Sequence, residues 1–255
     1  MINKPDEKLV SYLRHSRKIL IFTGAGISTG SGIPDFRGPH GIWKKRQPVY
    51  YQEFMSSGQA RRQYWEYKLE SWQSFKDARP NEVHKAIFKL ESARKLIMVV
   101  TQNIDGLHKL AGTSDERLVE VHGSMRYVEC QKCHSLSDPE PLFDNFRTTK
   151  KVPSCICGGY LKPATISFGQ NLRQEDLNRA FAAADEADLV VALGTTLSVT
   201  PAAVIPLRTS ERGVPYVIIN RGKTDHDNLS GLNLRLEGDV AVIFPPAVNA
   251  ALEPS

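Results

Sequence analysis

The chain alternates short apolar runs with longer amphipathic stretches. Five runs rich in β-branched residues and bounded by turn residues predict strands at Lys18–Phe22, Leu96–Thr101, Leu118–Val121, Asp188–Leu193 and Val214–Ile219. Their apolar character is nearly continuous, which is typical of strands buried on both faces of a parallel sheet. Helical periodicity lies between them, at Asp6–Ser16, Asn81–Ala93 and Gln174–Ala187. The pattern therefore predicts an α/β fold with a doubly wound, Rossmann-like parallel sheet.

Polar sequences follow four of the predicted strands. They begin at Gly24, Gln102, His122 and Gly194. Ligands of such sheets bind beyond the carboxyl ends of the strands. We therefore expect these four loops to converge on one cleft.

Two segments interrupt the alternation. The first is aromatic-rich and helical in pattern, and the second contains every cysteine but little apolar periodicity. Where the first segment ends, Pro80 restricts the preceding residue and Asn81 offers a helix cap. We expect a large Rossmann-like domain of residues 1–41, 81–125 and 163–255, interrupted by a helical insert at 42–80 and a small module at 126–162.

A glycine-rich loop, from Gly24 to Gly38, follows the first predicted strand. Closely spaced glycines let backbone N–H groups approach phosphate oxygens, and a helix starting after them would add its positive dipole end. Thr29 stands where the GxGxxG fingerprint has a glycine, so the loop departs from the dinucleotide pattern. Its tail places an acid, an aromatic ring and a base together, which suggests chemistry near a cofactor.

Charge and composition narrow the class of protein. The 255 residues carry a formal net charge of +5, yet the basic residues form no long run. This favours a solvated basic surface and makes a nucleic-acid partner unlikely. The N-terminus lacks an apolar signal core, and no stretch reaches the length of a membrane span. We expect a soluble, cytoplasmic protein with no membrane partner.

All four cysteines, Cys130, Cys133, Cys155 and Cys157, lie in the small module. In a reduced compartment such a cluster predicts structural zinc, held in a closed tetrahedral site. One residue separates the second pair instead of the usual two, but alternate residues of an extended segment share a face. If Cys157 does not reach the metal, His134 is the alternative ligand.

These motifs together resemble those of the sirtuins, the family of NAD-dependent protein deacylases. The segments that match are Gly24–Ser28, Gly32–Arg37, Thr101–His108, Val121–Ser124, the cysteine pairs, Phe168–Gly169, Gly194–Leu197 and Ile219–Asn220. They cover nearly the whole chain in the family's order. Within the family, the chain looks most like the class II branch, on the residues Tyr64, Trp65, Trp72, Phe75, Pro80, Asn81 and His84.

The resemblance implies a reaction between NAD and an acyl-lysine. The amide oxygen attacks the ribose carbon that carries nicotinamide, and a base later helps a ribose hydroxyl attack the resulting imidate. His122 is the expected base because histidine titrates near neutrality. Asn103 is the second expected catalytic residue, and the missing side chain of Gly123 would leave space for substrate. The alternatives without a catalytic role are a structural, hydrogen-bonded His122 and helix caps at Asn103 and Asp105.

The resemblance also implies a set of cofactor contacts. Phe36 would shield the reaction centre from water after nicotinamide leaves. The expected NAD-binding residues are Gly24, Ala25, Gly26, Ser28, Ile33, Pro34, Asp35, Phe36, Arg37, Gln102, Asn103, Ile104, Asp105, His122, Gly194, Thr195, Thr196, Asn220, Arg221, Asp239 and Val240.

The substrate would be an acyl-lysine protein or peptide that adds as an extended strand between the module and the large domain. Family members that prefer acidic acyl groups carry a Tyr-x-x-Arg pair, whereas this chain has Tyr64 and Tyr67 at that spacing. We therefore expect an apolar acyl tunnel, with Lys68 as the exception. The expected substrate-binding residues are Ile104, Ile166, Phe168, Gly169, Leu197, Val199, Tyr64 and Tyr67.

Other functions fit parts of the sequence. Mono-ADP-ribosyl transfer would use the same first step with a different nucleophile. A nicotinamide-dependent oxidoreductase would share the fold. A non-enzymatic zinc-ribbon binder of nucleic acid would fit the basic charge but leave the loop residues unexplained.

Overall fold

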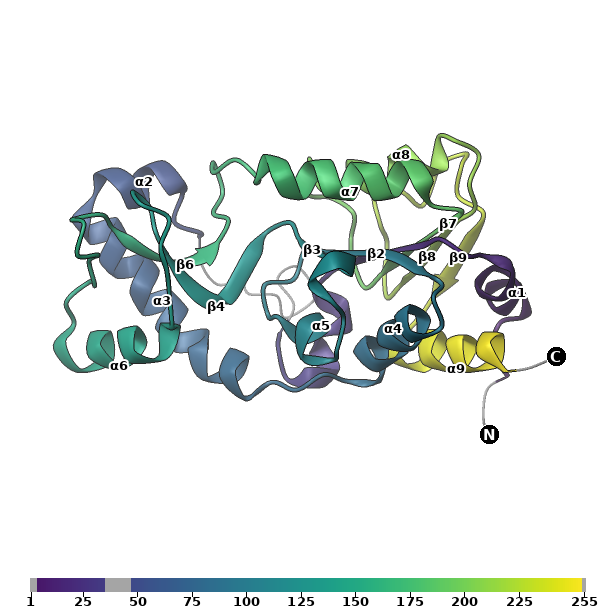
Figure 1. Ribbon diagram of the computed structural model, residues 1–255, viewed down its shortest axis with the longest axis horizontal. Coiled ribbons are helices and arrows are strands. Elements are labelled where there is room, and N and C mark those ends of the chain that lie inside the picture. Colours follow the sequence, from purple (N-terminus) through teal and green to yellow (C-terminus); the bar gives the residue numbers. More distant parts are fainter. Residues whose placement is uncertain (1–3, 35–46, 254–255) are drawn as a thin grey trace.

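The large sheet determines where a ligand can bind. The structure, a computed structural model, describes residues 4–34 and 47–253 (Figure 1). Six parallel strands are hydrogen-bonded in the order β3-β2-β1-β7-β8-β9. They are β1 (Ile19–Thr23), β2 (Leu96–Thr101), β3 (Leu118–Glu120), β7 (Leu189–Leu193), β8 (Tyr216–Asn220) and β9 (Leu234–Glu237). Because the strand order reverses between β1 and β7, the loops that follow these two strands meet at the topological switch point.

The five predicted strands are all present, and the predicted fold class is confirmed. The sequence pattern missed β9. This strand has three half-buried residues and the exposed Glu237, its two leucines alternate with charged residues, and it pairs only with β8 at the sheet edge. A short edge strand of this kind lacks the apolar run that identified the others.

Helices cover both faces of the large sheet (Figure 1). One face carries α1 (Glu7–His15), α4 (Glu82–Ser92) and α9 (Val240–Leu252), and the other carries α7 (Gln174–Glu186) and α8 (Val204–Ser210). Within β1, Ile19 and Ile21 pack on the first face, whereas Leu20 and Phe22 pack on the second. The sheet is thus buried on both sides, as its continuous apolar strands predicted. No described helix is long and apolar enough to span a membrane.

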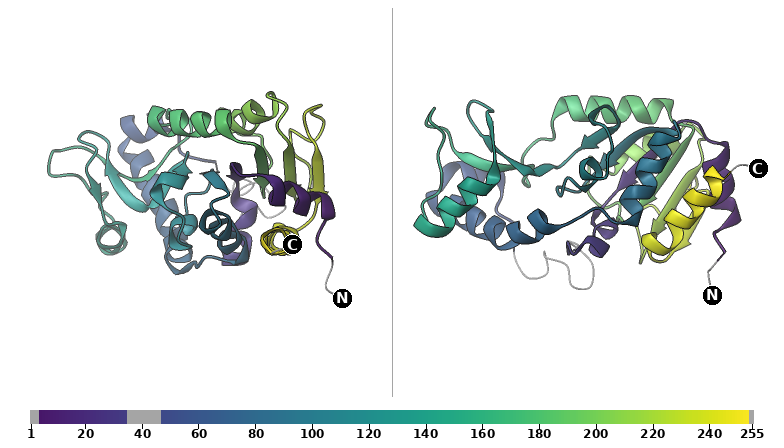
Figure 2. Two further views of the ribbon diagram at one scale, coloured as in Figure 1. Left: turned by 45° about the vertical axis from the view of Figure 1, so that its right-hand side comes forward. Right: turned by 60° about the horizontal axis from the view of Figure 1, so that its bottom comes forward.

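A second, smaller unit forms one end of the elongated molecule (Figure 2). Its antiparallel sheet has the order β5-β4-β6, from β4 (Gly123–Cys130), β5 (Leu136–Ser137) and β6 (Leu161–Thr165). The helices α2 (Tyr51–Ser56), α3 (Gly58–Asp77) and α6 (Pro139–Thr149) pack beside it. Trp65 of α3 lies 5.1 Å from Phe143 of α6, between ring centroids. The aromatic insert and the cysteine-containing segment therefore share one hydrophobic cluster, and β4 and β6 extend beyond both ends of residues 126–162.

Candidate functional site

The loops after β1 and β7 pack backbone against backbone at the switch point. A Cβ atom on Gly24 would lie 2.6 Å from Cβ of Thr195, and one on Gly26 would lie 2.8 Å from Cα of Gly194. Gly26 also donates a backbone hydrogen bond to the Gly194 carbonyl, at 2.9 Å. Gly194 itself has a φ of +59°, which favours glycine. We expected the first two glycines to make room for phosphate, but the structure shows that they make room for the β7 loop.

No α-helix starts within the described part of the glycine-rich loop, residues 24–34. Two short 3₁₀ turns follow β1, at Ala25–Ile27 and Thr29–Ser31. Asn81, the predicted cap of α4, accepts a hydrogen bond from the Val83 amide and donates to the Ile27 carbonyl at 2.8 Å. It therefore fixes this loop as well as the helix. Asp35, Phe36 and Arg37 lie outside the described residues.

Three buried polar side chains form a network between the ends of β1 and β2. The Asn103 amide donates to the Gly24 carbonyl and to Oγ of Ser28, each at 3.1 Å. Ser28 in turn donates to Oδ2 of Asp105 at 2.8 Å. The other carboxylate oxygen of Asp105 accepts from the Leu107 amide at 2.9 Å. The capping role is thus present at Asp105, at the start of α5 (Leu107–Leu110), together with a bond to the loop.

A small pocket opens at this network. Its lining contains six of the expected contacts and adds Phe75, which was expected only as a mark of the class II branch. The lining residues are Ala25, Ser28, Ile33, Phe75, Asn103, Ile104 and Asp105. Burial raises the pKa of Asp105, while its bonds from Leu107 and Ser28 and the charge of Arg126 oppose that shift. Pro34 follows Ile33 and is exposed.

His122 follows β3 and lies beside the same loops. Its Nδ1 is 3.1 Å from the carbonyl oxygen of Gln102. Because a carbonyl only accepts, Nδ1 carries the proton and Nε2 holds the lone pair of the neutral ring. The Gln102 side chain donates to Oγ1 of Thr195 at 2.8 Å, which joins the β2 and β7 loops. His122 is therefore oriented as a general base requires.

Gly123 has a different role from the expected one. A Cβ atom there would lie 2.1 Å from the carbonyl oxygen of Ala164 in β6, and its φ is +70°. Glycine at this position lets β4 pair closely with β6, where we had expected room for substrate. The Ile166 amide then donates to the His122 carbonyl at 2.8 Å, so the small sheet and the expected base are directly joined.

The residues expected at the adenosine end gather at the end of β8. The Asn220 side chain donates to the carbonyls of Arg221 and Gly222, each at 3.1 Å. Arg221 pairs with Asp239 at 2.9 Å, and Asp239 caps α9, whose first residue is the buried Val240. Thr196, in the β7 loop, accepts at its carbonyl from the Asp225 amide. Sequence reasoning missed Arg235 of β9, which donates to the Asn220 carbonyl, because β9 itself was missed.

The expected substrate residues lie in several parts of the structure. In the small unit, Phe168 and Gly169 are tied to α2, since their carbonyls accept from Tyr51 and Gln52. Beyond β7, the buried Leu197 donates its amide to Thr195, and the Val199 carbonyl accepts from Ala203. These four backbone groups are already bonded, so peptide pairing would have to use others. Ile104 and Ile166 lie nearer the base: Ile104 lines the pocket, and Ile166 bonds to His122.

The region around Tyr64 is less apolar than expected. Tyr64 is buried, its hydroxyl lies 3.0 Å from Oγ1 of Thr165, and its ring is 6.5 Å from that of Tyr67. The ammonium groups of Lys68 and Lys162 lie 5.4 and 5.5 Å from the Tyr64 ring centroid. Both lysines are buried, and burial lowers the pKa of each to about 7. The sequence pattern placed Lys68 on this face but gave no signal for Lys162.

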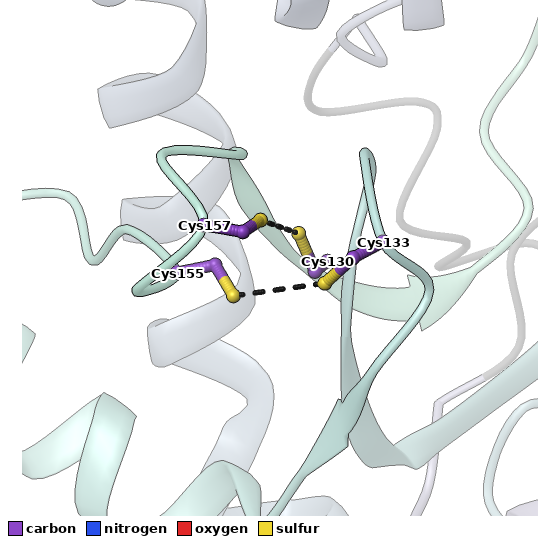
Figure 3. A group of neighbouring side chains, drawn as sticks. All are labelled: Cys130, Cys133, Cys155 and Cys157. Carbon is purple, nitrogen blue, oxygen red and sulfur yellow. Dashed lines mark hydrogen bonds between the residues drawn. The ribbon is translucent and has the colours of Figure 1, made fainter.

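The four cysteines converge at the tip of the small sheet (Figure 3). All four sulfur atoms lie within 4.8 Å of one another, with Cys130 and Cys157 3.5 Å apart and Cys133 and Cys155 3.8 Å apart. Tetrahedral zinc with Zn–S bonds of about 2.3 Å separates its sulfurs by about 3.8 Å, so this donor set fits zinc. A Cβ atom on Gly159 would lie 2.5 Å from the Cys130 sulfur. His134, the alternative ligand, instead points its Nδ1 at Glu129, 3.0 Å away.

Comparison with known proteins agrees with this site. The model of the Sir2 family matches residues 24–201. An NAD-dependent protein deacetylase of Rhodopseudomonas palustris is 39% identical over 230 residues, which cover 90% of this chain and 91% of the relative. An NAD-dependent protein deacetylase of Sulfurisphaera tokodaii is 38% identical, with 90% of each chain covered.

Solved structures agree as well. A Sir2 structure with a deacetylated p53 peptide and 3′-O-acetyl-ADP-ribose superposes with a TM-score of 0.86 at 35% identity, covering 95% of this chain and 96% of that one. A Sir2 complex with a p53 peptide and NAD gives a TM-score of 0.83 at 33% identity, covering 92% and 93%. Family model, sequence relatives and fold agree over nearly the whole chain, and this chain therefore belongs to the Sir2 family, the sirtuins.

Proposed function

We propose that this protein is an NAD-dependent protein-lysine deacylase, which transfers the acyl group to ADP-ribose and releases nicotinamide. The observation that carries the proposal is the position of His122. Its Nδ1 is held by the Gln102 carbonyl, beside the buried Asn103–Ser28–Asp105 network at the switch point. The Sir2 structures with NAD and with acetyl-ADP-ribose support the same function.

Each side chain of the network has a definite task in this proposal. Nε2 of His122 takes a proton from a ribose hydroxyl, while the Gln102 carbonyl keeps the ring in the required tautomer. Asn103 orients a ribose hydroxyl or a water, and Asp105 accepts from the nicotinamide amide. NAD, when bound, supplies the ribose carbon at which the acyl oxygen reacts. Zinc, held by the four cysteines, stabilises the small unit and takes no part in the chemistry.

The substrate proposed is an acyl-lysine in a protein or peptide. Sir2 structures with p53 peptides support a peptide substrate, and we propose that it binds as an extended strand between the two units. Within the family we propose the class II branch, on the sequence resemblance of insert residues that include Trp65, Trp72 and Phe75, which are buried in the core of the small unit. The cytoplasmic location remains a prediction of the sequence.

Mass spectrometry of a reaction with NAD and acyl-lysine peptides tests the function directly. We expect loss of the acyl group, release of nicotinamide and formation of O-acyl-ADP-ribose. His122→Ala should lower turnover by about 10²–10⁴-fold, the usual contribution of a general base. His134→Ala is the matched control, since this histidine points at Glu129, away from the site.

Three results would contradict the proposal. Gain of ADP-ribose on protein without loss of acyl groups would favour mono-ADP-ribosyl transfer. Formation of reduced nicotinamide would favour an oxidoreductase. Near wild-type turnover in His122→Ala would remove the histidine from its role as base.

A further inference from the structure

The turn that carries Asp105 is held from the small sheet. The Met125 amide of β4 donates to the Ile104 carbonyl at 2.8 Å. The next residue, Arg126, donates from Nε to the Asp105 carbonyl at 2.9 Å. Two consecutive residues of β4 therefore bond to two consecutive residues of the loop after β2.

The Arg126 side chain also fills the space beside this turn. A Cβ atom on Gly106 would lie only 2.8 Å from Cγ of Arg126. Gly106 has a φ of +69° and precedes the first residue of α5. The turn thus depends on glycine both for its backbone conformation and for the approach of the arginine.

The Arg126 charge also acts on the Asp105 carboxyl group. Burial raises the pKa of Asp105, and the Arg126 charge lowers it. Glu120 of β3 is a second acidic group near Asp105, and the two carboxylates repel each other. Burial and the Asp105 charge raise the pKa of Glu120 to about 7. Two further charges act on these groups: Lys109 of α5 lowers the pKa of Glu120, and Arg79 lowers the pKa of Arg126. Among these groups, Arg126 is the one whose charge favours ionised Asp105.

Local stability does not explain the position of Arg126. Burial lowers its pKa, and its Nη2 atom is buried with no hydrogen-bond acceptor among the described residues. Burying an unpartnered donor costs about 1–3 kcal/mol. An apolar side chain of similar length would avoid that cost. A role in the NAD site therefore explains the guanidinium group at this position better than local packing does.

We propose that Arg126 is a positioning residue: from the small sheet, it fixes the turn at Asp105 and Gly106 and supplies a positive charge that favours the ionised Asp105 carboxylate. The inference rests on the proposed function, in which Asp105 binds the nicotinamide end of NAD. It makes the geometry of the NAD site depend on β4, the strand that ends at Cys130.

The test compares Arg126→Met with Arg126→Lys across pH 6 to 9, using an acetyl-lysine peptide and the full chain. Arg126→Met removes the charge, so Asp105 protonates at a higher pH. The acidic limb of kcat/KM for NAD, to which the expected base His122 contributes in the same way in every variant, should then move to higher pH. At neutral pH, kcat/KM for NAD should fall by about tenfold, chiefly through KM for NAD, with KM for peptide unchanged. Arg126→Lys should keep the wild-type limb but lose a few-fold in kcat/KM.

Thermal unfolding separates positioning from a structural role. The midpoint of Arg126→Met should stay within a few degrees of the wild type, because the substitution also removes a buried unpartnered donor. Arg117→Met is the matched control: Arg117 donates from its guanidinium to the Ile97 carbonyl, near the start of the same strand β2. This control should leave the pH limb and KM for NAD unchanged.

Two results would overturn the inference. The first is a wild-type pH limb and a wild-type KM for NAD in Arg126→Met. The second, which decides the matter if Arg126→Met does not fold, is a shifted limb in the charge-preserving Arg126→Lys. A wild-type enzyme that removes no acyl group at any pH would instead refute the proposed function, so the two failures are distinguishable.

Discussion

The two sheet units of this protein are stabilised by different means. The two buried clusters of the large sheet consist of apolar side chains, and its four central strands, β1, β2, β7 and β8, are buried throughout. The small unit combines an aromatic cluster with four converging cysteines and the buried Lys68 and Lys162. We therefore expect apolar burial to stabilise the large sheet, whereas the small unit should depend on zinc held by its four cysteines.

Removal of zinc should have the largest effect of the changes considered, and it should unfold the small unit while the large unit stays folded. In chelator-treated protein or in Cys155→Ser, we expect amide protons of β4 and β6 to lose protection from hydrogen exchange while those of β1 and β7 keep it. Activity should be lost, because β4 holds the Asp105 turn. His134→Ala should keep a full equivalent of zinc. Retained protection in β4 of zinc-free protein would show that the aromatic cluster suffices.

Substitution in the glycine-rich loop should damage the site within the large unit. In Gly26→Ala, the new methyl group would meet the Gly194 backbone at 2.8 Å. We expect a loss of about 1–3 kcal/mol in unfolding free energy, as for overpacked cores. Displacement of the loop should cost about 10²-fold in kcat/KM. Gly30→Ala is the control in the same loop, since its nearest neighbour would be Nδ2 of Asn81 at 3.6 Å. Equal effects of the two substitutions would refute the loop contact.

Lys68→Met should stabilise the small unit, and more at low pH than at high pH. The folded-state pKa of Lys68 is about 7, against a usual value of 10.5. Below pH 7 the lysine is charged in both states and its burial is fully unfavourable; between pH 7 and 10.5 the folded state releases the proton and the penalty shrinks. In thermal unfolding experiments, the free energy of unfolding should rise by at least about 1 kcal/mol at pH 6 and by less at pH 9. The exposed Lys151→Met should show neither gain, and a pH-independent gain in Lys68→Met would contradict the buried charge.

Substitution of one helix cap in each unit should have the smallest effect on stability. Asn81→Ala in the large unit and Asp138→Ala in the small unit should each lower the unfolding free energy by about 1 kcal/mol. Only Asn81→Ala should also raise KM for NAD, because Asn81 bonds to the Ile27 carbonyl and to Ser31. Equal KM values in the two variants would show that the cap does not hold the loop.

Sequence patterns predicted the large unit well and the small unit less well. The five apolar runs became β1, β2, β3, β7 and β8, because strands buried on both faces must be apolar throughout. In the small sheet, β4 mixes buried and partly exposed positions without strict alternation, and β5 has only two residues, so periodicity gave no signal. Motif spacing nevertheless identified the cysteine cluster, since metal ligation constrains sequence more strongly than a half-buried strand does.

The sequence by itself determined the fold class, the family, the cysteine cluster and the residues that gather at the switch point. These depend on local patterns and on residue types that particular chemistry requires. Only the tertiary structure decided what faces those residues: the β7 loop against Gly24 and Gly26, the β6 backbone against Gly123, and the Arg126 guanidinium against the Asp105 turn. The physical reason is that close approach between distant segments depends on how the two sheets are placed, which no short stretch of sequence encodes.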